Sequence, residues 1–342
     1  MRRRTLLAGM AVTGLAAPLL ARGRDALRPL APDDFTIVAQ GLDRPECVAV
    51  GRDGRLFVST MDAAIAIREP GGAFRPLGAP GASTGVALDR RERVVIANMG
   101  LLNGRPGTLE RLDPATGVVE TLAAAIDGRA LVASNAPAIA RDGTIYCTHS
   151  SWGPVQNIGT TDPAGFVYSV APDGSVRTVA QGLRGANGCC LDRHERFLYV
   201  SLTAAGTILR FPRRRDGSLG PGEQYGPVLG TVVPDQMVAQ IVKLPRAERA
   251  TLGYADNIAF DAAGNLWICL PFANRIVALT PDRRLVEIAH DPEGRRLSLP
   301  TALAWGGPDL RDLYIVSRGS GMVVTARTPV AGLALVNQRE AG

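Results

Sequence analysis

The sequence predicts an all-β protein, a six-bladed β-propeller of four-stranded blades that is closed by an N-terminal strand. Three observations support this fold. The 342-residue chain is 46% hydrophobic and 20% charged, which is enough apolar material for a large core. Its 39 glycines and 24 prolines are spread along the whole length, which is typical of short strands joined by tight turns rather than of long helices. A phrase of apolar strand, turn and apolar strand also recurs six times.

Residues 1–21 are predicted to be an export signal and not part of the fold. Residues 2–4 are arginines, residues 6–20 are apolar, and Ala21 is a plausible cleavage edge. The arginine pair at the start of this segment resembles a twin-arginine motif, whose route exports proteins that are already folded. A transmembrane anchor is the alternative, but the apolar run is shorter than the ~20 residues that a spanning helix needs. We therefore expect a periplasmic protein with no stable membrane insertion after signal removal.

The charge balance argues against a nucleic-acid partner. The chain has 38 Lys and Arg against 32 Asp and Glu, and removal of residues 1–21 lowers the net charge from +6 to 35 − 32 = +3. The basic clusters at 213–215 and 283–284 are short and have no interleaved aromatic residues, which is typical of solvated loops. We expect a small-molecule partner and no nucleic acid. Composition carries no information on the oligomeric state.

The cysteine pattern favours free thiols. The chain has five cysteines, Cys47, Cys147, Cys189, Cys190 and Cys269. Because the number is odd, at least one thiol stays unpaired within the chain. The spacing contains no CxxC pair and each cysteine lies in an apolar, strand-like run, so we favour buried thiols that act as small hydrophobic residues over a zinc site. Whether any two form a disulfide stays open.

The repeat defines the blades. Its copies start, 38, 51, 52, 69 and 45 residues apart, at Glu46, Thr84, Asn135, Asn187, Asp256 and Thr301. These spacings suit four-stranded blades with loop insertions. A second β-rich run begins ten residues after the start in the first five copies and slightly later in the sixth, and turns such as Asp53-Gly54 separate the two runs.

An N-terminal strand is expected to close the ring. The apolar run 35–39 precedes the first copy, while the last copy is short of an outer strand. A strand from the N-terminal run would complete the last blade and leave no open edge. We therefore expect one propeller domain over residues 35–335; an ordinary β-sandwich is the alternative.

The first residue of every copy is polar and is followed by an apolar stretch. If the leading strand of each blade is the innermost one, these six residues form a ring at one rim of the central channel. Two carboxylates and two amides that converge on one axis are hard oxygen ligands, suited to calcium, magnesium or manganese. The alternative is that each residue only caps the turn before its strand, but Glu46 has no particular turn preference.

The loops after the second strands should form the wall of a pocket above this ring. They supply Asp62, Asn98, residues 149–162, residues 272–274 and Arg318. The loop 149–162 is long enough to act as a partial lid. Within it, His149 is either a substrate contact or proton shuttle, or a loop residue with no special role. Trp152 is either a hydrophobic wall for the substrate or an anchor for its loop.

Several of these phrases resemble the regucalcin and gluconolactonase family of six-bladed propeller lactonases. The resemblance covers about residues 35–325 and rests on the following phrases: Arg44-Pro45-Glu46, Ser134-Asn135, Ala186-Asn187-Gly188, Tyr254-Ala255-Asp256 and Gly264-Asn265-Leu266-Trp267. It implies one divalent metal ion held by Glu46, Asn187 and Asp256, with calcium favoured and zinc, magnesium and manganese possible. Asn135 would lie near the metal or the substrate, and Asp256 would also handle the proton.

The chain departs from the family pattern at three positions. Glu46 is followed by Cys47-Val48 where family members commonly have Gly-Pro, and Asp256 is followed by Asn257 rather than Gly. Ala133 stands where sugar-lactone members often place an arginine. The resemblance therefore retains the metal set but not the set that contacts the sugar.

The expected function is metal-dependent hydrolysis of a lactone in the periplasm. Asp256 is the predicted catalytic residue, and Glu46, Asn187 and Asp256 are the predicted metal ligands. The predicted substrate-binding residues are Asn135, His149 and Trp152. The chain contains no His-Glu-x-x-His motif, and no nucleotide cofactor is expected. The alternative is a non-hydrolytic propeller of the strictosidine-synthase-like or sensor type that binds a small molecule or a protein.

Overall fold

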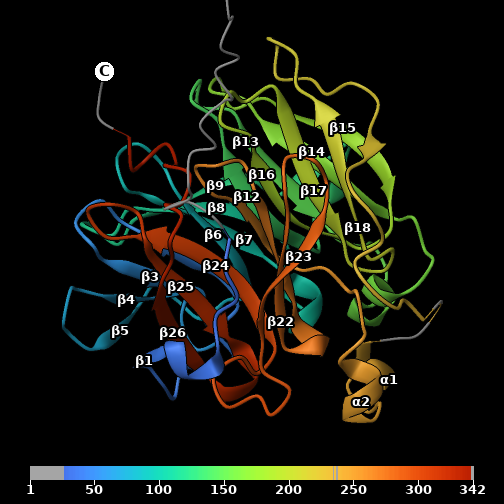
Figure 1. Ribbon diagram of the computed structural model, residues 1–342. Coiled ribbons are helices and arrows are strands. Elements are labelled where there is room, and N and C mark those ends of the chain that lie inside the picture. Colours follow the sequence, from blue (N-terminus) through green and yellow to red (C-terminus); the bar gives the residue numbers. More distant parts are fainter. Residues whose placement is uncertain (1–26, 234, 236–237, 340–342) are drawn as a thin grey trace, which may run out of the picture.

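The computed structural model describes residues 27–233, 235 and 238–339, and most of its regular secondary structure is β-strand (Figure 1). Six antiparallel sheets of four strands each form the blades of a β-propeller, so the predicted fold class is confirmed. The predicted signal peptide, residues 1–21, lies outside the described residues.

Each blade is a meander of strands in which the first strand is innermost. Blade one contains β2 (Val48–Val50), β3 (Leu56–Val58), β4 (Ile65–Arg68) and β5 (Phe74–Leu77). Blade two contains β6 (Ser83–Leu88), β7 (Val94–Asn98), β8 (Leu109–Leu112) and β9 (Val119–Ala123). Blade three contains β12 (Ser134–Ile139), β13 (Ile145–His149), β14 (Gly165–Val170) and β15 (Val176–Leu183). A small hairpin of β10 (Ala125–Ile126) and β11 (Arg129–Ala130) precedes blade three.

The second half of the chain repeats this order. Blade four contains β16 (Ala186–Leu191), β17 (Phe197–Leu202), β18 (Thr207–Pro212) and β19 (Glu223–Gln224). Blade five contains β20 (Ile258–Phe260), β21 (Leu266–Leu270), β22 (Arg275–Leu279) and β23 (Leu285–His290). Blade six contains β24 (Pro300–Gly306), β25 (Asp312–Ser317) and β26 (Met322–Arg327), and its outer strand is β1 (Thr36–Ala39).

The predicted closure by the N-terminal strand is confirmed. β1 pairs antiparallel with β26, with Thr36 opposite Thr325 and Ile37 opposite Val324. Figure 1 shows this contact as a blue strand beside a red one, from opposite ends of the chain. Because the outer strand of the last blade comes from the start of the chain, backbone hydrogen bonds hold the ring closed.

The core lies between adjacent blades. In the described part of the chain, each neighbouring pair of blades shares one cluster of buried apolar side chains. Between blades five and six, for example, the rings of Trp267 and Trp305 meet edge to face at 5.2 Å. Second strands such as β21 are buried at every position because blades pack against both of their faces. This explains why these strands are continuous apolar runs in the sequence.

The cysteines are free thiols, as favoured from the sequence. Four of the five are buried, and Cys190 is half-buried. Burial raises the pKa of Cys47 to about 11 and that of Cys147 to about 12. Both thiols are therefore protonated at neutral pH and act as small apolar side chains.

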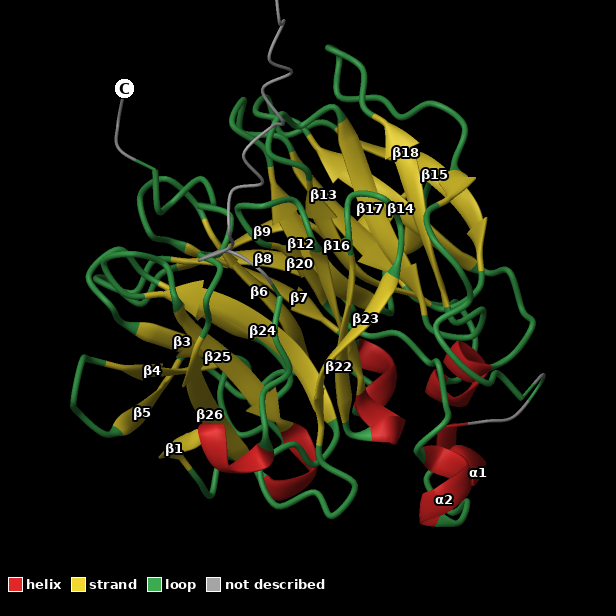
Figure 2. Ribbon diagram, viewed as in Figure 1, coloured by secondary structure: helices red, strands yellow, loops and turns green. Residues whose placement is uncertain are grey.

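Short helices gather at one end of the propeller (Figure 2). Four 3-10 helices follow the second strands of blades two, three, five and six: η2 (Gly100–Leu102), η3 (Val155–Gly159), η4 (Pro271–Ala273) and η5 (Arg318–Ser320). An insertion between β19 and β20 carries α1 (Val238–Ile241) and α2 (Arg246–Arg249), and η1 (Pro32–Asp34) precedes β1. None of the helices in the described ranges is long and apolar enough to cross a membrane.

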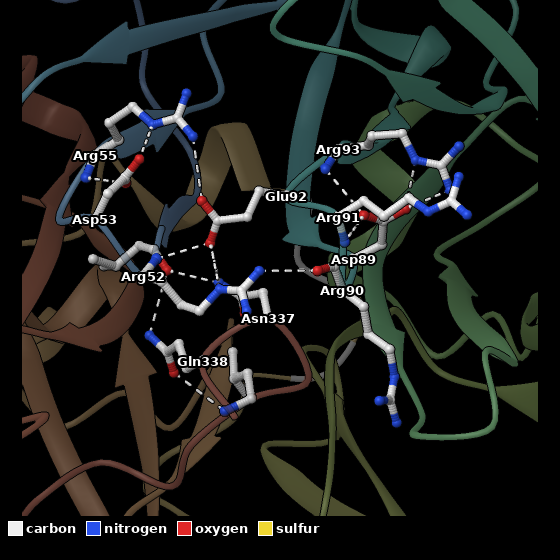
Figure 3. Close-up of polar contacts among 12 residues, drawn as sticks. Arg52, Asp53, Arg55, Asp89, Arg90, Arg91, Glu92, Arg93, Asn337 and Gln338 are labelled. Carbon is white, nitrogen blue, oxygen red and sulfur yellow. Dashed lines mark hydrogen bonds and ion pairs between the residues drawn. The ribbon is translucent and has the colours of Figure 1, made fainter. Parts of the chain in front are cut away.

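Arginines link the turns at the opposite end of the inner strands. The Arg52 guanidinium donates to the carbonyl of Arg90 at 3.1 Å, and Arg90 donates to the carbonyl of Arg141 at 2.9 Å. Arg141 donates in the same way to Arg193, which donates to the carbonyl of Ala262. Each turn from blade one to blade five is thus bound to the next, and Figure 3 shows the first members of this chain of contacts.

The C-terminal segment closes that same end of the channel. Asn337 Nδ2 donates to the Val50 carbonyl at 3.0 Å, and Gln338 Nε2 donates to the Trp305 carbonyl at 2.8 Å. Figure 3 shows both side chains next to Glu92, which accepts a bond from Asn337. The two ends of the axis therefore differ, because one is covered by this segment and the other is lined by the short helices.

Candidate functional site

The structure brings all six leading residues of the repeat together. They line a single cavity of about 280 Å³ at the end of the axis that carries the short helices, and they are Glu46, Thr84, Asn135, Asn187, Asp256 and Thr301. Asn135, Asn187, Thr84 and Thr301 are buried. The offset of each residue within its repeat therefore determines its position at the channel rim.

Irregular strand geometry aims these side chains at the cavity. The pairing register shifts at Thr84, Asn135, Asn187 and Thr301, which lie where the first strand of the blade meets the second. A bulge of this kind frees one residue from the ladder and redirects its side chain. Glu46 and Asp256 stand just before their strands, where the Glu46 N–H donates to the carbonyl of Ser59, just after β3, and the Asp256 N–H donates to the carbonyl of Cys269 in β21.

Asn135 is anchored to the neighbouring blade through a hydroxyl group. Its Nδ2 donates to Ser150 Oγ at 2.8 Å, and Ser150 Oγ donates to the carbonyl of Ala186 at 2.7 Å. Ala186 is the residue immediately before Asn187. The hydrogen bonds therefore position one ring residue relative to the next.

Asn187 repeats this arrangement one blade further. Its Nδ2 donates to Thr203 Oγ1 at 3.1 Å, and Thr203 Oγ1 donates to the carbonyl of Ala255 at 2.8 Å, next to Asp256. From the sequence, Ser150 was expected at the pocket only as part of the loop 149–162, and Thr203 was not assigned to the site. A signal was present, because a hydroxyl residue follows each asparagine by 15 or 16 positions.

Three charged side chains line the cavity in the described part of the chain: Glu46, Asp256 and Arg318. Arg318, on η5, forms an ion pair with Glu46. Burial lowers the pKa of Arg318, with the nearby Arg44 contributing in the same direction. Two carboxylates and one guanidinium leave one net negative charge when all three are ionised.

Asp256 has no cationic partner of this kind among the residues that the structure describes. Burial raises the pKa of its carboxyl from 3.8 to about 7, although hydrogen bonds from Asn187 and from the Asn257 backbone act in the opposite direction. Desolvation is the dominant cause because the charged form has lost water without gaining a counter-ion. A cation next to this carboxyl would remove most of that cost.

The polar ring fits a hard divalent cation. No group of three or more His, Cys, Asp or Glu side chains with metal-binding geometry occurs among the described residues. The donors here are instead two carboxylates and two amides, from Glu46, Asp256, Asn135 and Asn187. Because Ser150 and Thr203 bind the amide nitrogens, the amide oxygens are the atoms left to act as ligands. Carboxylate and amide oxygens are the ligands that calcium prefers.

The remainder of the cavity wall is mainly apolar. It consists of Met99, Leu102, Val155, Ile158, Thr203, Val242, Tyr254, Ala255, Pro271, Phe272 and Leu299. The loop 149–162 contributes through η3, and the expected wall residues Phe272 and Arg318 are present.

Two other residues that were expected in the wall lie elsewhere: Asp62 lines a separate groove, and Asn98 donates a hydrogen bond to Thr108. Val242 and Tyr254 come from the insertion before blade five, whose contribution was not expected.

His149 and Trp152 lie apart from this cavity, so their predicted contact with substrate finds no support in their positions. His149 is fully buried, and its Nε2 accepts hydrogen bonds from the backbone N–H groups of Val132 and Ala133. Its ring lies 4.3 Å from Trp152 and 4.4 Å from Phe166. Burial lowers the pKa of His149 to about 3, so its imidazole is neutral and supports the loop.

The fold and the site define a six-bladed propeller with an oxygen-rich ring in an axial cavity. The chain belongs to the SMP-30/gluconolactonase/LRE-like family, whose model matches residues 76–319. The resemblance found in the sequence is thereby confirmed. Ala133, at the position where many sugar-lactone members have an arginine, is fully buried in an apolar cluster with Met99 and Ile158.

Individual relatives are distant. The chain is 27% identical over 153 residues to a 6-deoxy-6-sulfogluconolactonase of Pseudomonas putida, and the match spans 45% of each protein. The chain thus spans less than half the length of the curated relatives it matches. A solved gluconolactonase of Xanthomonas campestris is 21% identical with a TM-score of 0.64, over 87% of this chain and 89% of that one. A regucalcin of Agrobacterium tumefaciens, described as calcium-binding, is 16% identical with a TM-score of 0.66, over 86% and 94%.

Proposed function

We propose that the axial cavity hydrolyses a lactone with one bound divalent cation, and that calcium is the preferred ion. The observation that carries the proposal is the convergence of Glu46, Asn187 and Asp256 on one cavity, where Asp256 is half-buried and has no counter-ion among the described residues. The family assignment supports lactone hydrolysis, and the calcium-binding neighbour supports a metal.

Each polar residue of the site would have its own role. Glu46, Asn187 and Asp256 would hold the cation, with Asn135 beside it. When bound, the cation supplies polarisation of the lactone carbonyl and acidification of water. Asp256 accepts the proton of the attacking water; burial raises its pKa towards neutrality and a nearby cation lowers it, so the carboxyl is ionised at neutral pH. The apolar wall limits the access of bulk water.

The test begins with protein stripped of metal by a chelator. Calcium, magnesium, manganese or zinc salt is then added. The melting temperature and the release of acid from a panel of lactones are measured for each salt. Calcium should raise the melting temperature, because a ligand that binds only the folded state stabilises it. In Glu46→Gln, calcium should neither raise the melting temperature nor support acid release from a lactone. Thr84→Ala, at a ring position with no assigned donor role, should keep both effects of calcium.

Two results would contradict the proposal. If no cation changes the melting temperature, the ring does not bind metal. If metal binds but no lactone is opened, the non-hydrolytic binding propeller becomes the better description.

We also propose that the protein is exported to the periplasm by the twin-arginine route. The support is the basic and apolar pattern of residues 1–21, which lie outside the described part of the chain. Replacing Arg3 and Arg4 by Lys should block export. Unchanged periplasmic yield of the double variant would exclude this route.

A further inference from the structure

We propose that the substrate is a lactone with an apolar alkyl or aryl substituent rather than a polyhydroxylated sugar lactone. This inference rests on the proposed lactone hydrolysis and concerns the part of the substrate that lies above the polar ring. Three features of the cavity carry it: an apolar wall built by blades two and three, a second apolar wall built by the insertion, and hydroxyl groups that already have partners.

Blades two and three build the first apolar wall. Met99, Leu102, Val155 and Ile158 all line the cavity and belong to one hydrophobic cluster that joins η2 to η3. Ala133 is packed inside the same cluster and is fully buried. No polar side chain from this cluster reaches the cavity, because all its members are aliphatic.

The insertion before blade five contributes to the second wall. Tyr254 and Phe272 meet edge to face at 5.6 Å in a hydrophobic cluster of their own, and both line the cavity with Val242. The Tyr254 hydroxyl donates to the Val233 carbonyl at 2.8 Å and accepts from the Val233 N–H at 3.1 Å. Tyr254 therefore presents its ring to the cavity, while its polar atom is engaged elsewhere.

The hydroxyl groups around the cavity are also engaged. Thr301 Oγ1 donates to the Glu46 carbonyl at 2.7 Å, and Thr203 Oγ1 donates to the Ala255 carbonyl. Thr84 Oγ1 faces backbone carbonyls at 3.3 to 3.4 Å. Among the described lining residues, the polar atoms that remain for a ligand belong to the two carboxylates, the two asparagines and Arg318.

This distribution separates two kinds of lactone. The lactone group itself can use the polar ring, but the several hydroxyl groups of a sugar lactone would be buried against apolar walls without partners, which is unfavourable. An alkyl substituent gains affinity instead, by about fourfold for each buried methylene group. The volume of about 280 Å³ is at the lower end for small-molecule sites, so a single ring with a short substituent fits best.

The test compares kcat/KM of the calcium-loaded protein for δ-valerolactone, δ-decalactone, dihydrocoumarin and glucono-δ-lactone. We expect δ-decalactone or dihydrocoumarin to exceed δ-valerolactone by at least about tenfold, and glucono-δ-lactone to be the poorest of the four. A preference for glucono-δ-lactone, or rates that do not depend on the apolar substituent, would overturn the inference.

A matched pair of variants locates the preference in the wall. Leu102→Asn places a polar group in the wall from blades two and three, and should lower the ratio of kcat/KM for δ-decalactone over δ-valerolactone by about tenfold. Val118→Asn, at a side chain that is 63% exposed and remote from the cavity, should leave the ratio unchanged. An unchanged ratio in Leu102→Asn would contradict the assignment of this wall.

Binding measured without turnover separates this inference from the proposed function. The lactams that match δ-decalactone and glucono-δ-lactone resist hydrolysis, and their effect on the melting temperature reports binding alone. If no lactone is opened but the decalactone-type lactam stabilises the protein, hydrolysis is wrong and the apolar preference stands. If lactones are opened but the sugar-type lactam binds more tightly, hydrolysis stands and the apolar preference is wrong.

Discussion

The Asp256→Asn substitution should stabilise the protein when divalent cations are removed. Burial raises the pKa of this carboxyl from 3.8 to about 7. Between these values the folded state holds a proton that the unfolded chain has released, so the free energy of unfolding falls as the pH rises from about 4 to 7. The difference of about three pKa units corresponds to about 4 kcal/mol above pH 7. Asn cannot ionise, so the variant should recover much of this amount at pH 8.

The Glu46→Gln substitution should have the opposite effect under the same conditions. Glu46 is paired with Arg318, whose side chain is 25% exposed. Removing the carboxylate leaves a largely buried guanidinium without its counter-ion, at a cost of about 1 to 3 kcal/mol. Replacing the two carboxylates of this cavity is therefore expected to change the free energy of unfolding in opposite directions.

Denaturant unfolding of the chelated wild type and of both variants, at pH 5 and pH 8, measures these effects. The advantage of Asp256→Asn should shrink at pH 5, where the wild-type carboxyl is protonated. With calcium present the variant should lose its advantage, and its turnover should fall by at least about 100-fold, the usual contribution of a general base. If Asp256→Asn is no more stable than the wild type at pH 8, or if its advantage does not depend on pH, the inferred desolvation of this carboxyl is wrong.

Three further substitutions test the surroundings of the site. His149→Phe should lower the free energy of unfolding by about 2 to 4 kcal/mol, because two backbone N–H groups lose their acceptor. It should change kcat by less than about threefold. A large loss of kcat in folded protein would instead indicate a catalytic role for His149. Thr203→Val should weaken calcium binding measured by titration calorimetry, since Asn187 loses its anchor, and unchanged affinity would refute the positioning role. Gly188→Ala should lower the melting temperature by several degrees, because a Cβ there would lie 2.8 Å from the Asp256 carbonyl oxygen. Gly174→Ala is the control for steric contact: nothing lies within 4 Å of its added Cβ, and it should cost only about 1 kcal/mol, through the strain of its positive φ of 85°.

The sequence was sufficient to predict the blades and the ring because both follow from a repeated offset. A polar residue ten positions before a second apolar run stands at the start of an inner strand, and six such strands share one axis. The closing strand was predictable for a similar reason, because the last repeat lacked an outer strand and residues 35–39 had no partner of their own.

The contacts across the ring could not be predicted in this way. Arg318 and Glu46 are brought together only when blade six meets blade one, and no local pattern encodes that meeting. The insertion between β19 and β20 matches no repeat, so its Val242 and Tyr254 were missing from the expected cavity wall. His149 occupies a position typical of a pocket loop, but its stacking with Phe166 depends on strand pairing within the folded blade.

The positions of the carboxylates connect the proposed cation to the closure of the ring. Glu46 belongs to blade one, and Asp256 precedes blade five. Two residues of blade six, Thr301 and Arg318, contact Glu46. The two ends of the chain are held together within blade six by the pairing of β1 with β26. A cation bound to Glu46, Asn187 and Asp256 would join blades one, four and five across the axis, so opening the ring would require its release. The same ion that serves the chemistry would therefore also stabilise the closed ring.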